Sequence, residues 1–311
     1  MRELPLRSVA PAKINLGLFV GPLRGDGKHE LVSVMQSISL ADELELEMAS
    51  DQASADEVIC PGVEGENLAA AALGLFRQRT GWDAPPLRLS IHKRIPIAGG
   101  LAGGSSDAAA TLRLAARASG LGDAKLLSEL AAHLGSDVPA LIKPGRWLAS
   151  GAGEKLRGLA EPNPPFGVLV LPSQLELSTA AVYEQADRMG LARSSSELAE
   201  RHRQLGLALD FGVSAPPKEL LENDLQPAAI KLCPEIKKRL KLVTDAGADA
   251  TFLSGSGPTV VGLFLRANPL SRAERARETL AQCEPAPLVC APVSGQPDAV
   301  WPGGASQLKT T

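Results

Sequence analysis

Aromatic residues are scarce in this chain: they make up 3% of its 311 residues, and only one of them is a tyrosine. The hydrophobic core must therefore be built mainly from leucine, valine, isoleucine and alanine. Hydrophobic residues form 44% of the sequence, which is enough for a sizeable core. The length is about twice that of a typical domain and favours two domains.

Cysteine and histidine are also infrequent, with four residues of each, and their spacing excludes two kinds of site. No cysteine pair has the C-x-x-C spacing, and no histidine pair has the H-x-x-x-H spacing of a metal-binding helix. A zinc site or a disulfide framework is therefore not expected. Reduced thiols are typical of the cytosol, so we expect a cytoplasmic protein.

The chain has neither a strong excess of one charge nor a long apolar segment. Its net charge of −3 does not favour nucleic acid or an anionic membrane as a partner. No apolar run approaches the length of a membrane-spanning helix, and residues 1–8 lack the apolar core of a signal peptide. We therefore expect no nucleic-acid or membrane partner, and any phosphate site should be built locally from loop amides and a few cations.

Hydrophobic periodicity and turn residues predict a mixture of strands and helices in both halves of the chain. This mixture is typical of an α+β fold. Strands are predicted over residues 9–20, 31–40, 43–48, 87–95, 166–171, 251–253 and 259–265. Helices are predicted over residues 67–79, 107–119, 124–134, 179–189, 195–207 and 234–246.

A domain boundary is predicted at residues 161–165, where three prolines in four residues exclude a helix or a central strand. We therefore expect an N-terminal domain over residues 1–160 and a C-terminal domain over 161–295. Residues 296–311 are rich in glycine, proline, serine and threonine, which predicts a loose tail.

The strongest functional signal is a glycine-rich loop over residues 96–110, between a predicted strand and a predicted helix. Glycines allow backbone amides to approach a ligand closely, and the helix that follows adds unpaired N–H groups and the positive end of its dipole. This combination favours a polyphosphate site over a merely flexible loop. The residues predicted to bind the nucleotide here are Pro96, Ala98, Gly99, Gly100, Leu101, Ala102, Gly103, Gly104, Ser105 and Ser106.

Two other phosphate loops do not fit these residues. No lysine follows the glycines as in G-x-x-x-x-G-K-[ST], and the glycines cannot be aligned with the G-x-G-x-x-G of dinucleotide-binding domains. Ser105, Ser106 and Asp107 are good capping residues, so we expect them to cap the helix that begins at about residue 107.

The sequence resembles the GHMP kinases, named for galactose, homoserine, mevalonate and phosphomevalonate. Three motifs of that family occur in order: residues 11–16, the glycine loop, and residues 253–259. Further matches favour the branch of the family that phosphorylates a cytidine diphosphate-linked polyol of the non-mevalonate isoprenoid pathway. They comprise residues 24–31, 66–68, 134–139, 151–154 and 223–225.

The resemblance implies a two-domain fold with the active site in the cleft between the domains, and it implies two catalytic residues. Asp137 takes the place of the family's aspartate that orients or deprotonates the acceptor hydroxyl. Lys13 takes the place of the active-site lysine, which would keep that carboxylate ionised and stabilise charge on the transferred group. From the residues alone, Asp137 fits an ordinary turn and Lys13 the polar face of a strand.

The resemblance also implies binding residues. Asn67 and Lys93 would lie near the adenine, although Asn67 is equally suited to cap a helix. Asn15 would contact substrate hydroxyls, and His29 would hydrogen-bond the cytosine. The family usually has tyrosine where this chain has Lys28, which replaces a stacking ring with a charge. The remaining candidates near the acceptor or the transferred phosphate are Thr179, Gly255 and Gly257, for which a capped helix and a hairpin turn are the alternatives.

These expectations describe a small-molecule kinase that uses ATP and Mg²⁺, because phosphoryl transfer requires charge neutralisation. No residue in the sequence singles itself out as the metal ligand. Two alternatives stay open: another GHMP kinase acting on a sugar or a mevalonate-like acceptor, and a catalytically inactive nucleotide-binding regulator. A monomer and a homodimer are equally compatible with the sequence.

Overall fold

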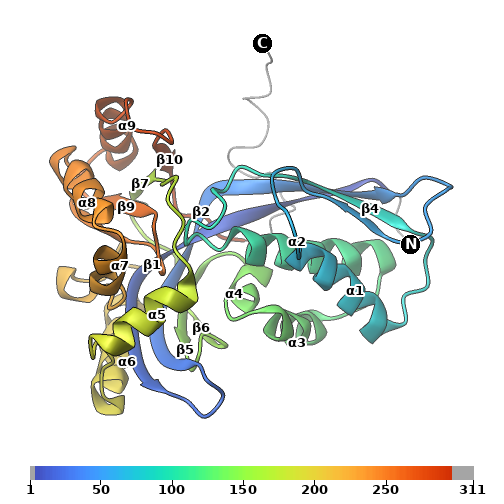
Figure 1. Cartoon of the computed structure of the whole chain (residues 1–311), viewed down its shortest axis with the longest axis horizontal. Helices are drawn as coiled ribbons and strands as arrows, with labels where there is room; N and C mark the ends of the chain where they lie inside the picture. Colours follow the sequence, from blue (N-terminus) through green and yellow to red (C-terminus); the bar gives the residue numbers. More distant parts are fainter. Residues whose placement is uncertain (1–3, 296–311) are drawn as a thin grey trace.

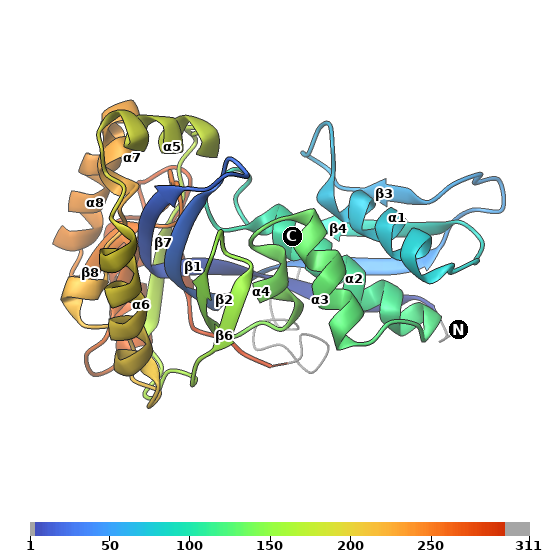
Figure 2. The ribbon, with the colours of Figure 1, turned by 90° about the horizontal axis from the view of Figure 1, so that it is seen from below.

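The computed structural model describes residues 4–295, so the loose tail predicted for residues 296–311 lies outside the described residues. The described chain contains two β-sheets with helices packed against them, and the expected α+β class is confirmed. Figure 1 shows helices α1–α3 at one end of the molecule and helices α6–α9 at the other, and Figure 2 shows the same separation from below.

The first sheet has six strands in the order β3-β4-β2-β5-β6, with β1 paired to β2 off this path. Its strands are β1 (Leu6–Leu23), β2 (His29–Met48), β3 (Glu57–Ile59), β4 (Leu87–His92), β5 (Arg146–Ser150) and β6 (Lys155–Gly158). The helices within this part of the chain are α1 (Leu68–Thr80), α2 (Gly103–Ser119), α3 (Ala124–Leu134) and α4 (Val138–Ile142).

The second sheet has four strands in the order β10-β7-β9-β8. They are β7 (Gly167–Leu171), β8 (Ala250–Leu253), β9 (Val260–Phe264) and β10 (Leu288–Cys290). The accompanying helices are α5 (Thr179–Arg188), α6 (Ser195–Leu209), the 3₁₀ turn Lys218–Leu220, α7 (Gln226–Leu232), α8 (Glu235–Asp245) and α9 (Pro269–Thr279). No helix among residues 4–295 is both long and apolar enough to cross a membrane.

Strands β1 and β2 form a long antiparallel ribbon that runs through both ends of the molecule (Figure 1). The prediction of two strands over 31–40 and 43–48 is wrong, because β2 continues through Ala41 and Asp42, which pair with Pro11 and Ala10. Register shifts interrupt the ladder between Pro11 and Lys13 and again beyond Asn15. Such irregularities bend a strand and redirect its side chains. Lys13 and Asn15 therefore lie where β1 departs from regular pairing with β2.

Helix α1 has the termini that its sequence predicts. The Asn67 side chain accepts a hydrogen bond from the Ala69 amide, and Gly81 closes the helix in the left-handed conformation at φ 66°. Helices α1 and α2 share one hydrophobic cluster with β2 and β4, which includes Leu73 and Phe76. This packing fixes α2 against the sheet and leaves its first turn beside β1.

Helix α2 begins earlier than predicted. Gly103 and Gly104 are part of the helix. Its N-cap residue is Ala102, which has a φ of 58° and makes no side-chain capping hydrogen bond. The predicted capping role of Ser105, Ser106 and Asp107 is therefore wrong. The cause is that the glycines adopt helical geometry, so the first unpaired N–H groups of the helix belong to the glycine loop itself.

Candidate active site

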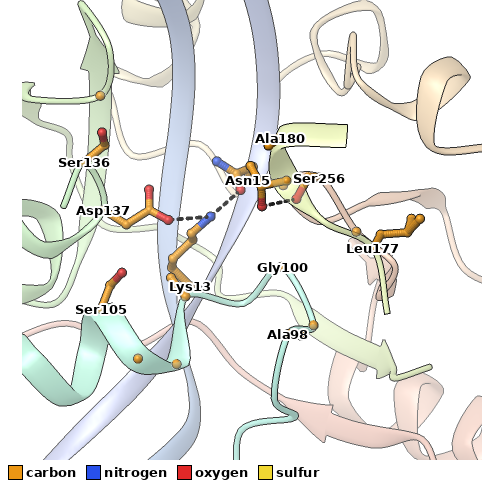
Figure 3. A pocket seen from close by; sticks show the side chains of 18 of the residues that line it. Lys13, Asn15, Ala98, Gly100, Ser105, Ser136, Asp137, Leu177, Ala180 and Ser256 are labelled. Carbon is orange, nitrogen blue, oxygen red and sulfur yellow. Dashed lines mark hydrogen bonds and ion pairs between the residues drawn. The ribbon is translucent and has the colours of Figure 1, made fainter. Parts of the chain in front are cut away.

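A cavity of about 1010 Å³ lies between the first sheet, the glycine loop and helix α5. Strand β1, the loop before α2, the residues before α4, the start of α5 and the turn after β8 all contribute to its lining (Figure 3). Every residue predicted to act in the site lines this cavity except Leu101 and Ser106. Segments that are far apart in the sequence thus meet around one space.

Lys13 and Asp137 face each other in this cavity. The Lys13 Nζ lies 3.4 Å from Asp137 Oδ2 and donates a hydrogen bond of 2.8 Å to Asn15 Oδ1 (Figure 3). The Lys13 side chain is 6% exposed, whereas that of Asp137 is 31% exposed. Asp137 therefore combines a cationic partner with access to the cavity, which suits a carboxylate that accepts a proton from a bound hydroxyl.

Asn15 is held by a short chain of hydrogen bonds. Its Nδ2 donates to Ser33 Oγ at 2.7 Å, and this hydroxyl donates to the carbonyl oxygen of Gly17 at 2.7 Å. Because the amide is fixed at both ends, its oxygen holds the Lys13 ammonium in one orientation. The predicted contact of Asn15 with a substrate hydroxyl stays a prediction.

The glycine loop packs against the turn after β8. Gly100 has a φ of 74°, and a Cβ added there would lie 2.3 Å from the carbonyl oxygen of Ser254. The Ser254 hydroxyl donates to the Gly100 carbonyl at 3.0 Å. At the other end of the loop, Gly103, Gly104 and Ser105 form the first turn of α2 and line the cavity. The unpaired N–H groups of that turn make a site for an anion such as a phosphate.

Lys93 lines the cavity and forms ion pairs with two carboxylates. Its Nζ donates to Asp42 at 2.5 Å and to Asp107 at 2.7 Å. Burial, with a contribution from the charge of Asp42, raises the pKa of Asp107 to about 7. Asp107 Oδ1 is buried and has no hydrogen-bond partner among the described residues. Both carboxylates engage Lys93, so this corner presents no free cation to a phosphate.

The opposite end of the cavity contains the predicted cytosine-binding residues. His29 Nδ1 lies 2.9 Å from the Gly21 carbonyl oxygen, and its Nε2 lies 3.2 Å from Asp187 Oδ1. The ring of Tyr183 lies 5.5 Å from that of His29 at an interplanar angle of 30°. Burial and the nearby charge of Asp137 raise the pKa of Tyr183 to about 12. This end of the cavity therefore presents an aromatic face and polar groups together.

Comparison with known proteins shows the family to which this chain belongs. The N-terminal domain of the GHMP kinases matches residues 67–145, and their C-terminal domain matches residues 203–285. A 4-diphosphocytidyl-2-C-methyl-D-erythritol kinase of Anaeromyxobacter sp. (strain K) is 42% identical over 267 residues, covering 83% of this chain and 80% of the relative. The chain belongs to the GHMP kinase family.

Other members of the family agree with this result. A kinase of the same name from Leifsonia xyli is 40% identical over 268 residues, covering 82% of this chain and 86% of the relative. A crystal structure of 4-(cytidine 5'-diphospho)-2C-methyl-D-erythritol kinase superposes with a TM-score of 0.74 at 32% identity, covering 93% of this chain and all of the other. The mevalonate kinase of L. major has a TM-score of 0.71 at 17% identity, which shows the shared fold alone. The expected GHMP kinase fold is thereby confirmed.

Two predictions for this GHMP kinase need correction. The Ser106 side chain does not reach the cavity, because it is fully buried and donates to the Pro11 carbonyl at 2.7 Å. Leu101 is 1% exposed and packs in the core, while its carbonyl accepts a hydrogen bond from the Lys13 amide at 3.1 Å. Both residues therefore join the glycine loop to β1 instead of lining the cavity.

Several lining residues of this GHMP kinase escaped the sequence-based prediction. Ser256 Oγ lies 3.0 Å from Thr179 Oγ1, so the predicted Thr179 has a partner on the turn after β8. Ser136 beside Asp137 also lines the cavity. Ser256 lies in the matched motif of residues 253–259, in which only Gly255 and Gly257 were assigned a role. Ser136 lies in the matched segment of residues 134–139, in which only Asp137 was assigned a role.

No cluster of three or more His, Cys, Asp or Glu among residues 4–295 could hold a metal ion by itself. The oxygen-bearing side chains that line the cavity include the Asp137 carboxylate and the Ser105 hydroxyl. Mg²⁺ in kinases usually keeps several waters and needs few protein ligands beside the phosphates. These two side chains therefore fit an ion that enters with the nucleotide.

Proposed function

We propose that this GHMP kinase transfers the γ-phosphoryl group of ATP to the 2-hydroxyl of 4-diphosphocytidyl-2-C-methyl-D-erythritol. The observation that carries the proposal is the pair of Lys13 and Asp137, 3.4 Å apart, in the cavity that the glycine loop also lines. Relatives that bear this substrate in their names, at about 40% identity over most of the chain, support the choice of acceptor.

In the proposed reaction, the acceptor hydroxyl lies against Asp137 and its oxygen attacks the γ-phosphorus of ATP. The new oxygen–phosphorus bond forms as the bond from the γ-phosphorus to the β–γ bridging oxygen breaks, and ADP leaves. The hydroxyl proton passes to the Asp137 carboxylate. Lys13 offsets negative charge on the carboxylate and on the transferred group, and positioning supplies most of the rate.

The nucleotide is proposed to lie with its phosphates on the first turn of α2 and its base near Asp107. Asp42, Lys93 and Asp107 together carry no net positive charge, so they do not compete with the loop for phosphate. Asn67 and Lys93, the predicted adenine contacts, line this part of the cavity. Asp137 and Ser105 would hold Mg²⁺, which when bound neutralises charge on the β- and γ-phosphates.

The cytidine of the acceptor is proposed to lie beside His29 and Tyr183, whose rings already contact each other at 5.5 Å. Of the three lysines that line the cavity, Lys28 alone has no ion pair among the described residues. Its ammonium would contact the cytidine nucleotide by charge, in place of the ring that the family usually provides.

We also propose a functional division of the chain at residues 161–165. All strands of the first sheet lie within residues 6–158, and all strands of the second within 167–290. Residues 1–160 would then form the ATP-binding domain, and residues 161–295 would complete the acceptor side through α5 and the turn after β8.

The proposal is tested by following ADP release from Mg·ATP in the presence of the cytidyl substrate, with mevalonate, homoserine and galactose assayed in parallel. We expect turnover with the cytidyl substrate and a loss of about 10²- to 10⁴-fold in kcat for Asp137→Ala. Asp245→Ala serves as the control, because Asp245 pairs only with Lys241 on the surface of α8. Turnover of another acceptor alone would overturn the substrate, and nucleotide binding without any turnover would favour a regulator.

The charge of Lys28 is also compatible with a second class of acceptor. A free cation at the acceptor end would also suit a carboxylate, as in a mevalonate-like acid. The parallel assays distinguish this case, since Lys28→Met would then raise the KM for the acid and leave the KM for the cytidyl substrate unchanged.

A further inference from the structure

Asn223 is a buried polar residue that the proposed reaction leaves without a role. It precedes α7, is 8% exposed, and does not line the cavity that contains Lys13 and Asp137. It belongs to the short motif of residues 223–225 that the sequence comparison with the family singled out.

All hydrogen bonds of the Asn223 side chain are made to backbone groups. Its Nδ2 donates to the carbonyl oxygens of Leu253 and Gly255, at 2.8 and 2.7 Å. Its Oδ1 accepts a hydrogen bond of 2.9 Å from the Leu225 amide. A buried amide with both donors engaged on the same turn fixes that turn, because breaking either bond leaves a buried carbonyl unpaired.

The backbone around Asn223 is tied to the strand that carries the catalytic lysine. The Leu18 amide donates to the Glu222 carbonyl at 2.8 Å, and the Asp224 amide donates to the Leu18 carbonyl at 2.9 Å. The Asp224 side chain accepts from the Val20 amide at 3.0 Å. Asn223 therefore joins β1 to the turn after β8, although the two segments are more than 200 residues apart in sequence.

That turn approaches the catalytic pair closely. A Cβ added to Gly255 would lie 3.6 Å from Asn15 Oδ1 and 3.7 Å from Lys13 Nζ. The C=O and N–H of one trans peptide point in opposite directions. Because the Gly255 carbonyl points to Asn223, the N–H of Ser256 in the same peptide points away from it. Ser256 lines the cavity, so this amide belongs to the side of the turn that faces away from Asn223.

We propose that Asn223 is a positioning residue for phosphoryl transfer. By holding the Gly255 carbonyl, it directs the Ser256 amide toward the transferred phosphoryl group, where the amide stabilises charge that develops on the phosphoryl oxygens. The proposal rests on the proposed function for the identity of the reaction. The orientation of the peptide itself depends only on the contacts of Asn223.

Asn223→Asp is the decisive variant. Aspartate keeps the oxygen for Leu225 and the size of the side chain, but it replaces two donors with a charge facing two carbonyl oxygens. Gln226→Glu is the matched control, because it makes the same change from amide to carboxylate three residues away. Gln226 uses only its oxygen, which accepts from the Leu253 amide at 2.9 Å, and glutamate retains that acceptor.

We expect kcat to fall by about 10- to 100-fold in Asn223→Asp, while the KM values for ATP and acceptor change by less than about 3-fold. Gln226→Glu should stay close to the parent enzyme in all three constants. A general loss of structure would lower both activity and the melting temperature. Should Asn223→Asp fail to fold, Asn223→Ser removes the same donors without adding a charge and is held to the same expectation.

Amide hydrogen exchange provides a readout that needs no acceptor. With a non-hydrolysable ATP analogue and Mg²⁺, we expect added protection in the peptide covering residues 252–258 of the parent and of Gln226→Glu, and none in the Asn223 variants. Equal protection in all proteins, or equal kcat, would overturn the role of Asn223. If the parent turned over no acceptor, the proposed function would fail, and the exchange result alone would decide the role of Asn223.

Discussion

The three lysines of the cavity show how neighbours assign different roles to the same residue type. Lys93 is held by two buried carboxylates, Lys13 by one carboxylate and one amide oxygen, and Lys28 by no ion pair among the described residues. Lys93 therefore serves to join β2, β4 and α2. In the proposed reaction, Lys13 would also face the transferred group, and Lys28 would face the acceptor.

Lys13→Met should lower kcat by at least about 100-fold, because it removes the cation beside Asp137 and beside the transferred group. The affinity for ATP should change little if the loop amides provide most of the phosphate binding. The measurement is steady-state kinetics together with calorimetric titration of the nucleotide. Lys125→Met, on the exposed surface of α3 at 85% side-chain exposure, is the control. A kcat of Lys13→Met close to that of Lys125→Met would contradict the assignment.

Asp107 should make the stability of the protein depend on pH. Its pKa is raised to about 7 by burial, so the folded protein binds its proton more tightly than the unfolded chain. The stabilisation is complete below the ordinary carboxyl pKa and is lost as the pH rises through 7. Because asparagine does not titrate, Asp107→Asn should not lose this stabilisation as the pH rises. In urea unfolding between pH 5 and 8, the variant should gain up to roughly a few kcal/mol relative to the parent.

The control for Asp107→Asn is Asp51→Asn, at an exposed position in the turn after β2. Its stability should follow that of the parent at every pH. Parallel pH profiles for Asp107→Asn and the parent would show that the buried carboxyl is not the source of the dependence.

At the level of the element, the glycine loop depends on a strand, a helix and a turn for its shape. Ala98 and Ala102 have φ values of 54° and 58°, which are uncommon for residues with a Cβ. Such backbone persists only where the surroundings determine it. Here the surroundings are β1, the start of α2 and the turn after β8, so the loop is a rigid part of the site.

Gly100→Ala should abolish nucleotide binding or weaken it by at least about 10-fold. The new Cβ would lie 2.3 Å from the Ser254 carbonyl, and the φ of 74° is strained for alanine. Gly74→Ala is the matched control, since a Cβ there meets no atom within 4 Å in the middle of α1. The control should bind ATP normally and gain up to about 1 kcal/mol of stability. Normal ATP binding by Gly100→Ala would show that the loop can shift.

The bounds of a helix could be predicted from the sequence where capping residues mark its two ends. Helix α1 was predicted within one residue because Asn67 and Gly81 mark its ends, and α3 because Asp123 and Gly135 do so. Strand β2 was divided in error at Asp42, because a buried aspartate looks like a turn residue when its partners are unknown. Those partners are the Arg94 and Ile95 amides and Lys93, all about 50 residues away.

The same distinction applies to the site. Lys13, Asp137 and the glycine loop lie in motifs whose residues identify them. Asn223 and Ser256 also lie in matched motifs, but their side-chain partners belong to remote segments: Asn223 bonds to Leu253 and Gly255, and Ser256 to Thr179. No local pattern encodes those contacts, so only the folded structure could reveal them.

At the scale of the whole molecule, the two sheets are joined by more than the β1–β2 ribbon. Arg146 on β5 is 1% exposed and extends from the first sheet to the segment that follows α6. Its guanidinium donates to Gln36 Oε1 at 2.8 Å and to the carbonyl oxygens of Val213 and Ser214, both at 2.6 Å. Burial lowers the pKa of Arg146 to about 10. A buried cation without a direct ion pair among residues 4–295 is tolerated here because it donates to three acceptors.

Arg146→Met should therefore destabilise the protein by about 2 to 4 kcal/mol, because it leaves the buried Gln36 and two partly buried carbonyl oxygens without this donor. Since Arg146 does not line the cavity, the KM values for ATP and acceptor should stay near those of the parent below the melting transition. Arg157→Met is the control: it lies on the neighbouring strand, its side chain is 46% exposed, and it pairs with Asp210 at the surface. Its cost should be at most about 1 kcal/mol. Urea unfolding compares the two variants, and equal costs would mean that Arg146 is not a principal connection between the two halves of the enzyme.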